Sequence, residues 1–235
     1  MKKQRIPEEI FVTASPEYLL SLFPFCSVSL SFLKAQDSTD LVFLIDGSQN
    51  VGAANFPSVR NLVVRIIDRL SVGRDQIRVA LVQYDNDPDI KFYLNSLYDK
   101  PQVLEEVKGL TYSGGDESNL GAALEEVARS LLTDTTGNRA DEGVPQVLVI
   151  ISAGPSSDDT SVGHRALNRA GVFTIGVSIG DAATADLEEV ATDRSFVQKT
   201  SDFRALATVG DQLVRDINRF AQGTIITQNQ FTEGM

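Results

Sequence analysis

Short, mainly apolar segments mark the strands that we expect. Residues 41–45, 147–151 and 172–177 are almost continuously apolar, which is typical of strands covered on both faces in a parallel sheet. Residues 77–84 are predicted to form another strand. Residues 90–94 alternate between apolar and polar side chains, as an antiparallel edge strand does.

Between these strands, apolar residues recur at the spacing of amphipathic helices. The first stripe follows Asn55, a residue type favoured at the N-cap, and Pro57 suits the first helical turn. The pattern predicts helices at about residues 56–70, 99–110, 120–131, 159–170, 185–191 and 209–220, and a short strand at residues 195–198. Strands and helices therefore alternate along most of the chain.

This alternation predicts the fold class. We expect a doubly wound α/β domain with a mostly parallel sheet, one antiparallel edge strand and helices on both faces. In such a sheet, ligands meet the loops at the carboxyl ends of the strands, near the point where the strand order reverses. Three predicted loops qualify, at residues 46–50, 114–119 and 152–157.

The folded domain is expected to span about residues 37–222, with other kinds of segment at either end. Residues 1–36 have a basic start and an apolar middle, like a secretory signal, but Pro24 and Lys34 interrupt that pattern. A signal-like segment and a disordered segment therefore both stay open as interpretations. Residues 223–235 are expected to be a polar linker or tail.

Charge and cysteine content narrow the classes of partner. The formal net charge is −11, which disfavours nucleic acid because phosphates are bound by clusters of Lys and Arg. The single cysteine, Cys26, lies outside the predicted domain, so neither a disulfide framework nor a cysteine zinc site is expected within it.

A basic stripe runs along and beyond the first predicted helix. It consists of Arg60, Arg65, Arg69, Arg74 and Arg78. Two interpretations are open: binding of a glycosaminoglycan or another acidic partner, and a solvated face paired with acidic neighbours. We favour the second, because charge runs are usually of that kind.

The sequence carries no recognisable set of catalytic residues. It contains no Gly-x-Ser-x-Gly elbow, no Walker A loop and no Gly-x-Gly-x-x-Gly after the first strand. Residues 176–180 are predicted to be a strand end and turn rather than a phosphate loop. His164, the only histidine, is expected on a helix at or near the surface, because no partner for general-base or metal chemistry is indicated. We predict a binding module rather than an enzyme.

Several of these segments together resemble the von Willebrand factor A domain. The run from Asp40 to Ser48 resembles the first strand of that family, and residues 77–85 resemble its second strand. Residues 114–119 and 145–154 resemble its other two top loops. Each motif is modest alone, but four in the same order make a strong match. Within the family, the sequence at residues 109–115, 143–147 and 170–177 is most similar to the N-terminal A domains of the collagen VI alpha-3 chain.

Many A domains carry a metal-ion-dependent adhesion site, and the resemblance locates the corresponding positions here. The family pattern is Asp-x-Ser-x-Ser on the first loop, a Thr on the second and an Asp on the third. These positions are held by Asp46, Ser48, Asn50, Ser118 and Ala153. Because Ala153 removes a carboxylate that a hard cation such as Mg²⁺ needs, we expect a vestigial site with no bound metal and no cofactor, weak Mg²⁺ binding being the alternative.

Asp46 is expected to have a structural role instead. At a strand end, its carboxylate can accept hydrogen bonds from Ser48, Ser118 and backbone N–H groups, which would hold the three loops together. Three further acids, in the second loop or just after the third, are candidate replacement ligands, although their spacing does not place them in the site: Asp116, Asp158 and Asp159.

The resemblance implies a secreted structural and interaction module of the extracellular matrix. As an A domain of a collagen VI-type chain, it would contact matrix proteins and other A domains of the same assembly, in microfibril assembly and cell adhesion. We expect these contacts to be independent of metal and of membrane insertion. The alternatives are a metal-dependent adhesion domain, a small-molecule-binding α/β enzyme and an intracellular A-type domain.

Overall fold

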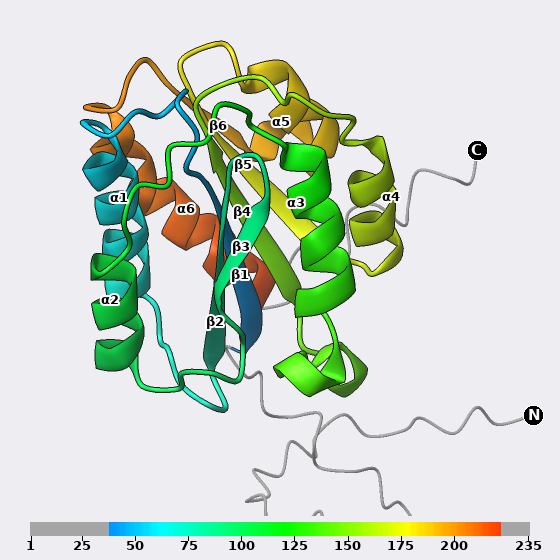
Figure 1. Ribbon diagram of the computed structural model, residues 1–235. Helices are drawn as coiled ribbons and strands as arrows, with labels where there is room; N and C mark the ends of the chain where they lie inside the picture. Colours follow the sequence, from blue (N-terminus) through cyan, green and yellow to red (C-terminus); the bar gives the residue numbers. More distant parts are fainter. Residues whose placement is uncertain (1–37, 222–235) are drawn as a thin grey trace, which may run out of the picture. The chain divides into compact units, whose positions relative to one another are not determined.

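A computed structural model describes residues 38–221, which form a single six-stranded sheet flanked by helices (Figure 1). The strands are β1 (Thr39–Asp46), β2 (Ile77–Tyr84), β3 (Pro88–Phe92), β4 (Gln146–Ser152), β5 (Phe173–Ile179) and β6 (Val197–Thr200). The predicted leader, residues 1–36, and tail, residues 223–235, lie outside the described residues and stay predictions.

The strand order is β3-β2-β1-β4-β5-β6. Only β3 is antiparallel to its neighbour; the other pairs are parallel. The predicted fold class is therefore confirmed, including the antiparallel edge strand. The order reverses between β1 and β4, so the loops after these two strands lie where doubly wound sheets bind ligands.

Helices cover both faces of the sheet (Figure 1). One face carries α1 (Phe56–Arg69), α2 (Lys100–Lys108) and α6 (Leu206–Ala221), and the other carries α3 (Leu120–Glu126), α4 (Ser161–Arg169) and α5 (Thr184–Val190). The alternation of β1 explains this two-sided core, since successive strand residues point to opposite faces. Phe43 and Ile45 pack under the first group of helices, whereas Val42 and Leu44 pack under the second.

Local structure departs from the sequence expectation at three places. The predicted helix at residues 120–131 changes after Glu126 into a π-helical turn, Val127–Leu131. The last strand begins only at Val197, because Asp193 accepts a hydrogen bond from the backbone of Ser195 and initiates a 3-10 turn first. Asn55 does occupy the N-cap position of α1, but its side chain donates to the carbonyl of Val51 rather than capping the helix.

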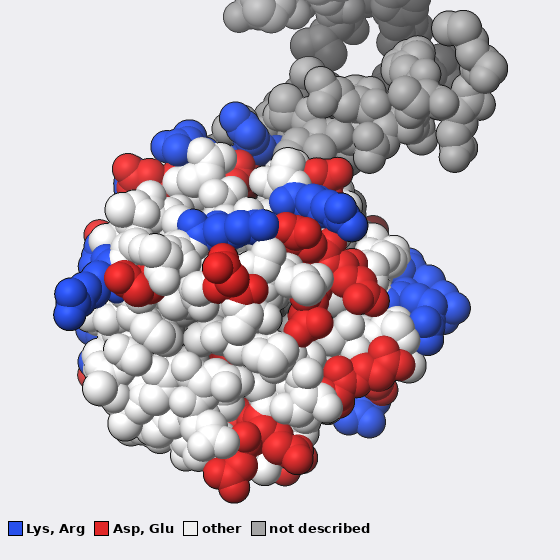
Figure 2. Space-filling view, turned by 90° about the horizontal axis from the view of Figure 1, so that it is seen from above, with Lys and Arg blue, Asp and Glu red and all other residues white. Residues whose placement is uncertain are grey.

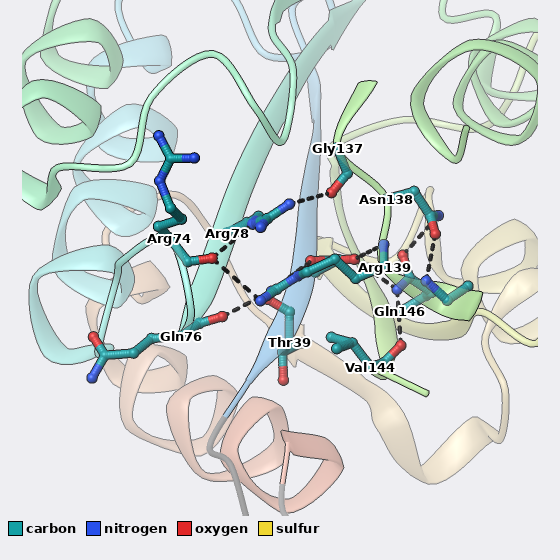
Figure 3. A network of polar contacts seen from close by, with 11 residues as sticks. Thr39, Arg74, Gln76, Arg78, Gly137, Asn138, Arg139, Val144 and Gln146 are labelled. Carbon is teal, nitrogen blue, oxygen red and sulfur yellow. Dashed lines mark hydrogen bonds and ion pairs between the residues drawn. The ribbon is translucent and has the colours of Figure 1, made fainter. Parts of the chain in front are cut away.

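A buried ion pair ties the chain together at the amino ends of the strands (Figure 3). The guanidinium of Arg139 donates from Nε to Asp40 Oδ1 at 2.8 Å, and the backbone N–H of Arg139 donates to Asp40 Oδ2 at 2.7 Å. Its Nη2 also donates to the carbonyls of Thr39 and Gln76. Both charged side chains are almost fully buried, at 4% and 0% exposure. One arginine therefore joins the segment before β4 to β1 and to the start of β2.

Close packing between α3 and α4 depends on Gly163. A Cβ atom added there would lie 2.5 Å from Leu124 Cβ and 2.9 Å from the backbone nitrogen of Glu125. In a helix interior, Gly→Ala normally raises the free energy of unfolding by about 1 kcal/mol, but overpacking of this kind lowers it by about 1–3 kcal/mol. We therefore expect Gly163→Ala to lower the free energy of unfolding in urea, measured by far-UV circular dichroism.

The matched control is Gly210→Ala in α6. A Cβ at Gly210 would lie 3.6 Å from Leu62 Cδ1, which is an ordinary contact, so this change should stabilise the domain by up to about 1 kcal/mol. Equal effects of the two substitutions would show that α3 and α4 are not in the close contact described.

Candidate functional site

The three loops predicted to form the site do meet at the carboxyl ends of the strands. The backbone N–H of Gly114 donates to the carbonyl of Gly47 at 2.9 Å, and that of Gln49 donates to Gly115 at 2.9 Å. The N–H of Ser157 donates to the carbonyl of Ser118 at 2.8 Å. Backbone hydrogen bonds thus join the second loop to both of the others.

Asp46 is the centre of this arrangement and is fully buried. Its Oδ1 accepts from the backbone N–H of Ser48 at 2.9 Å. Its Oδ2 accepts from the N–H of Ala153 at 3.2 Å and from the hydroxyl of Ser152 at 3.3 Å. The carboxylate therefore links the first loop to the third, as a structural role requires.

The prediction that Ser118 donates a hydrogen bond to Asp46 is wrong. The hydroxyl of Ser118 is buried and makes no hydrogen bond to Asp46; it lies beside the phenol of Tyr84 instead. Ser152 takes that place instead, because it is the last residue of β4, the strand next to β1. The family pattern does not include this position, so the sequence offered no signal for it.

Asn50 and Ala153 occupy their positions without offering metal ligands at the centre. The side chain of Asn50 lies against Gly154, where an added Cβ would come within 2.2 Å of Asn50 Nδ2. The hydroxyl of Ser48 already accepts a hydrogen bond from the backbone of Asn50, at 3.3 Å. Ala153 packs its methyl group against the hydrophobic core on the α1 side of the sheet.

Two of the three candidate acids, Asp158 and Asp159, do not replace the missing carboxylate. Asp158 accepts at 2.7 Å from the N–H groups of Gly121 and Ala122, at the start of α3. Asp159 accepts from the backbone and the hydroxyl of Ser161, at the start of α4, and these hydrogen bonds lower its pKa. Both carboxylates are thus engaged with helix starts.

The donor set at this edge fits a divalent cation poorly. Mg²⁺ requires near-octahedral oxygen ligands, usually with one or two carboxylates. Of the five family positions, only Asp46 supplies a carboxylate, and both of its oxygens already accept hydrogen bonds. Among residues 38–221, no group of three or more His, Cys, Asp or Glu side chains is arranged to hold a metal.

Tyr84 completes the buried surroundings of Asp46 and was not among the predicted site residues. It is the last residue of β2 and pairs in register with Asp46. Its hydroxyl is buried, beside the hydroxyls of Ser118 and Ser152. Burial, and then the charge of Asp46, raise the pKa of the phenol well above its usual value of 10.0.

This raised pKa has a consequence for stability at alkaline pH. Above about pH 10 the unfolded chain loses the Tyr84 proton while the folded chain keeps it, so stability conferred by this group falls as pH rises. We expect the wild type to lose more stability than Tyr84→Phe as the pH rises above 10, by at most about 1.4 kcal/mol for each pH unit. Urea unfolding of both chains at pH 9, 10 and 11 measures this; parallel curves would contradict the assignment.

The remaining sequence candidates have structural environments. His164 is half-buried on α4, 2.8 Å from the Asn168 amide, as predicted. Residues 176–180 form the end of β5 and the turn at Gly180, as predicted.

Most of the basic stripe is engaged within the chain. Arg60 donates to the carbonyl of Leu110, and Arg69 pairs with Asp211. Arg74 and Arg78 lie over the ring of Tyr98, with guanidinium carbons 4.1 and 5.3 Å from its centroid. These contacts favour the interpretation of a paired surface; glycosaminoglycan binding stays a prediction.

Figure 2 shows the end of the molecule that carries the three loops. Acidic side chains gather on its right half and lower edge, while much of the lower left is uncharged.

In the described part of the chain, no helix has both the length and the apolar character needed to cross a bilayer. The fold and this loop edge define the class: an A-type binding domain whose cation-site positions are altered.

The comparison with known families agrees with this class. A model of the von Willebrand factor type A domain matches residues 40–212, and the chain belongs to that family. The collagen alpha-4(VI) chain of Mus musculus is 34% identical over 178 residues, which cover 75% of this chain but 8% of that protein. The collagen alpha-1(XX) chain of Homo sapiens is 33% identical over 186 residues, 78% of this chain and 14% of that protein. The resemblance to collagen VI chains is thus confirmed, and the chain matches a small part of each relative.

Solved structures show the same fold. Proximal thread matrix protein 1 from the mussel byssus superposes with a TM-score of 0.72 at 20% identity, over 77% of this chain and 48% of that one. Another structure of the same protein, described as having a zinc-occupied MIDAS motif, has a TM-score of 0.71 at 21% identity. Metal binding thus occurs in a protein of this fold.

Proposed function

We propose that this chain is a protein-interaction module of the extracellular matrix, acting as one A domain of a collagen VI-type chain in microfibril assembly and cell adhesion. Its partners would be matrix proteins and other A domains of the same assembly. The similarity to several collagen chains supports the setting. On this proposal the protein is secreted and performs no catalysis.

We further propose that its contacts need no bound metal. The observation that carries this is the engagement of Asp46. The one carboxylate left among the family positions uses Oδ1 for Ser48 and Oδ2 for Ser152 and Ala153. A carboxylate used in this way joins loops. A partner would therefore be recognised by the shape and charge of the surface rather than through a shared cation.

Binding of the labelled full-length chain to a decellularised fibroblast matrix tests this function. We expect saturable retention that the unlabelled chain displaces, with the same half-saturation in Mg²⁺ and Ca²⁺ as in EDTA. No displaceable retention would contradict the proposed matrix role. Loss of retention in EDTA alone would instead support the alternative of a metal-dependent adhesion domain.

The remaining alternative is an α/β enzyme. Its binding site would have to lie at the same loop edge, where Asp46 is the only one of the five family positions with an ionisable side chain. General acid–base or nucleophilic chemistry needs a second group within hydrogen-bond reach. Turnover of any substrate in a hydrolase or nucleotide panel would contradict the proposal.

A further inference from the structure

We propose that the groove between α3 and α4 is a docking site for a partner segment in which arginine alternates with aliphatic residues. This inference goes beyond the proposed function, because it names a surface and the chemistry of its ligand; it rests on that function only in assuming a protein partner. The groove lies on the side of the molecule, away from the basic stripe on α1.

The groove is a cavity that is lined in part by apolar side chains. Its volume is about 650 Å³, within the range of ordinary ligand pockets. Three small side chains, Ala122, Ala128 and Ala166, line it together with Val162. Val162 is 47% exposed, one of two large apolar side chains that are this exposed in the described chain. An apolar wall of this kind gains free energy when a partner covers it.

The local backbone contributes to this shape. At Gly163 the two helices are in close contact, as the distance from an added Cβ to Leu124 shows. Past Glu126 the helix that contains α3 changes into a π-helical turn, and Ala128 and Arg129 of that turn line the groove. Single π-turns within helices occur often at functional sites. The combination leaves a hollow beside a tight helix contact.

The charges around the hollow identify the kind of occupant. Four carboxylates line it, against the single guanidinium of Arg129, which is paired with Glu126. The side chains of Asp87 and Glu125 have no hydrogen bond or ion pair within the described chain, so they are available to a ligand. Asp158 accepts hydrogen bonds from the start of α3 and also lines the groove.

An arginine side chain satisfies both parts of this surface at once. Its aliphatic stem can cover the alanine floor while its planar guanidinium meets carboxylates at the rim. Bidentate guanidinium–carboxylate pairs are stronger and more directional than those of lysine. A neighbouring aliphatic residue of the same segment would cover Val162. Neither an acidic peptide nor a purely apolar one matches both features.

The test uses the full-length chain and a fluorescein-labelled synthetic peptide of alternating arginine and leucine, measured by fluorescence anisotropy. Comparison peptides replace every arginine with glutamate, or every leucine with serine. The protein variants are Glu125→Gln with Glu126→Gln, and Ala166→Trp, which fills the groove. The matched control is Glu105→Gln with Glu106→Gln, two exposed acids on α2 at the opposite face of the sheet.

We expect the arginine–leucine peptide to bind and the other two to bind at least about tenfold more weakly. The α3 double variant should weaken binding roughly five- to tenfold, given the modest worth of exposed charge pairs, and Ala166→Trp should abolish it. The α2 control should change affinity by less than about twofold.

Three results would overturn the proposal: no binding of the arginine–leucine peptide, equal weakening by the α2 and α3 pairs, or unchanged binding by Ala166→Trp. Circular dichroism of each variant shows whether it is folded. This result can be distinguished from that of the matrix experiment. A chain that is retained on matrix but does not bind the peptide would contradict the docking site in the groove and leave the proposed function uncontradicted.

Discussion

Arg139→Met is expected to lower the free energy of unfolding by about 3–5 kcal/mol, the cost of leaving a buried charge without its partner. Asp40 is fully buried and receives two hydrogen bonds from Arg139. The backbone N–H bond would survive the substitution, but the guanidinium charge would not. The carbonyls of Thr39 and Gln76 would also lose a donor. The chain has no tryptophan, so urea unfolding is best followed by far-UV circular dichroism.

Two further variants separate the buried charge from lost packing. In Asp40→Asn with Arg139→Met, the carboxylate is neutralised while an acceptor remains for Gln146 Nε2, which donates to Asp40 at 2.8 Å. This pair should recover a large part of the lost stability. Arg69→Met removes an arginine from an exposed ion pair with Asp211 and should cost less than about 1 kcal/mol. Equal losses for Arg139→Met and Arg69→Met would contradict the role assigned to the buried pair.

The double substitution Asn50→Ser with Ala153→Asp is expected to create divalent-cation binding where the wild type has none. It restores the hydroxyl and the carboxylate of the family pattern beside Asp46, Ser48 and Ser118, whose hydroxyl is already buried. A second carboxylate supplies the charge that a hard cation needs. Calorimetry with Mn²⁺ should therefore give saturable heats for the double variant and dilution heats alone for the wild type.

A second measurement, of stability with and without metal, shows whether that variant is folded. Without metal, two carboxylates side by side at a buried edge repel each other, so the double variant should be less stable than the wild type in EDTA. With Mn²⁺ at about one hundred times its dissociation constant, stability should rise by about 2.7 kcal/mol. A double variant that is folded but unaffected by Mn²⁺ would show that these loops no longer have the family geometry.

The fold was predictable because each strand has a strong local pattern. The continuous apolar run in β1 requires cover on both faces, and every residue of that strand is buried. The helix positions also followed from apolar spacing. The ends of elements were less predictable, because they depend on particular side-chain bonds. The turn at Asp193 delays β6, and the π-helical turn after Glu126 leaves no mark in the apolar spacing of α3.

The site was predictable in its location but not in all of its bonds. The strand-end rule and the family pattern together placed Asp46, Ser48 and Ser118 at one edge, and the loops do meet there. The bond from Ser152 to Asp46 depends on the register between β1 and β4, which no local pattern specifies. Tyr84 was missed for the same reason, since its hydroxyl is part of the site only through the pairing of β2 with β1.

The Arg139–Asp40 pair shows a further limit of sequence reasoning. These residues are about one hundred positions apart in the chain, and neither is one of the five cation-site positions of the family. Arg139 lies in a segment without regular strand or helix spacing, where an arginine is normally exposed. Only the packing of that segment over the start of β2 reveals that it is buried.

Anomalous scattering of manganese, in a crystal of the wild-type chain soaked in Mn²⁺, tests directly whether Asp46 joins the loops instead of holding a metal. We predict no anomalous peak beside Asp46, with its carboxylate oxygens still bonded to the backbone of Ser48 and Ala153. A peak within about 2.2 Å of Asp46, Ser48 and Ser118 oxygens would contradict this role, because the loop edge would then hold a cation despite the absence of a third-loop carboxylate.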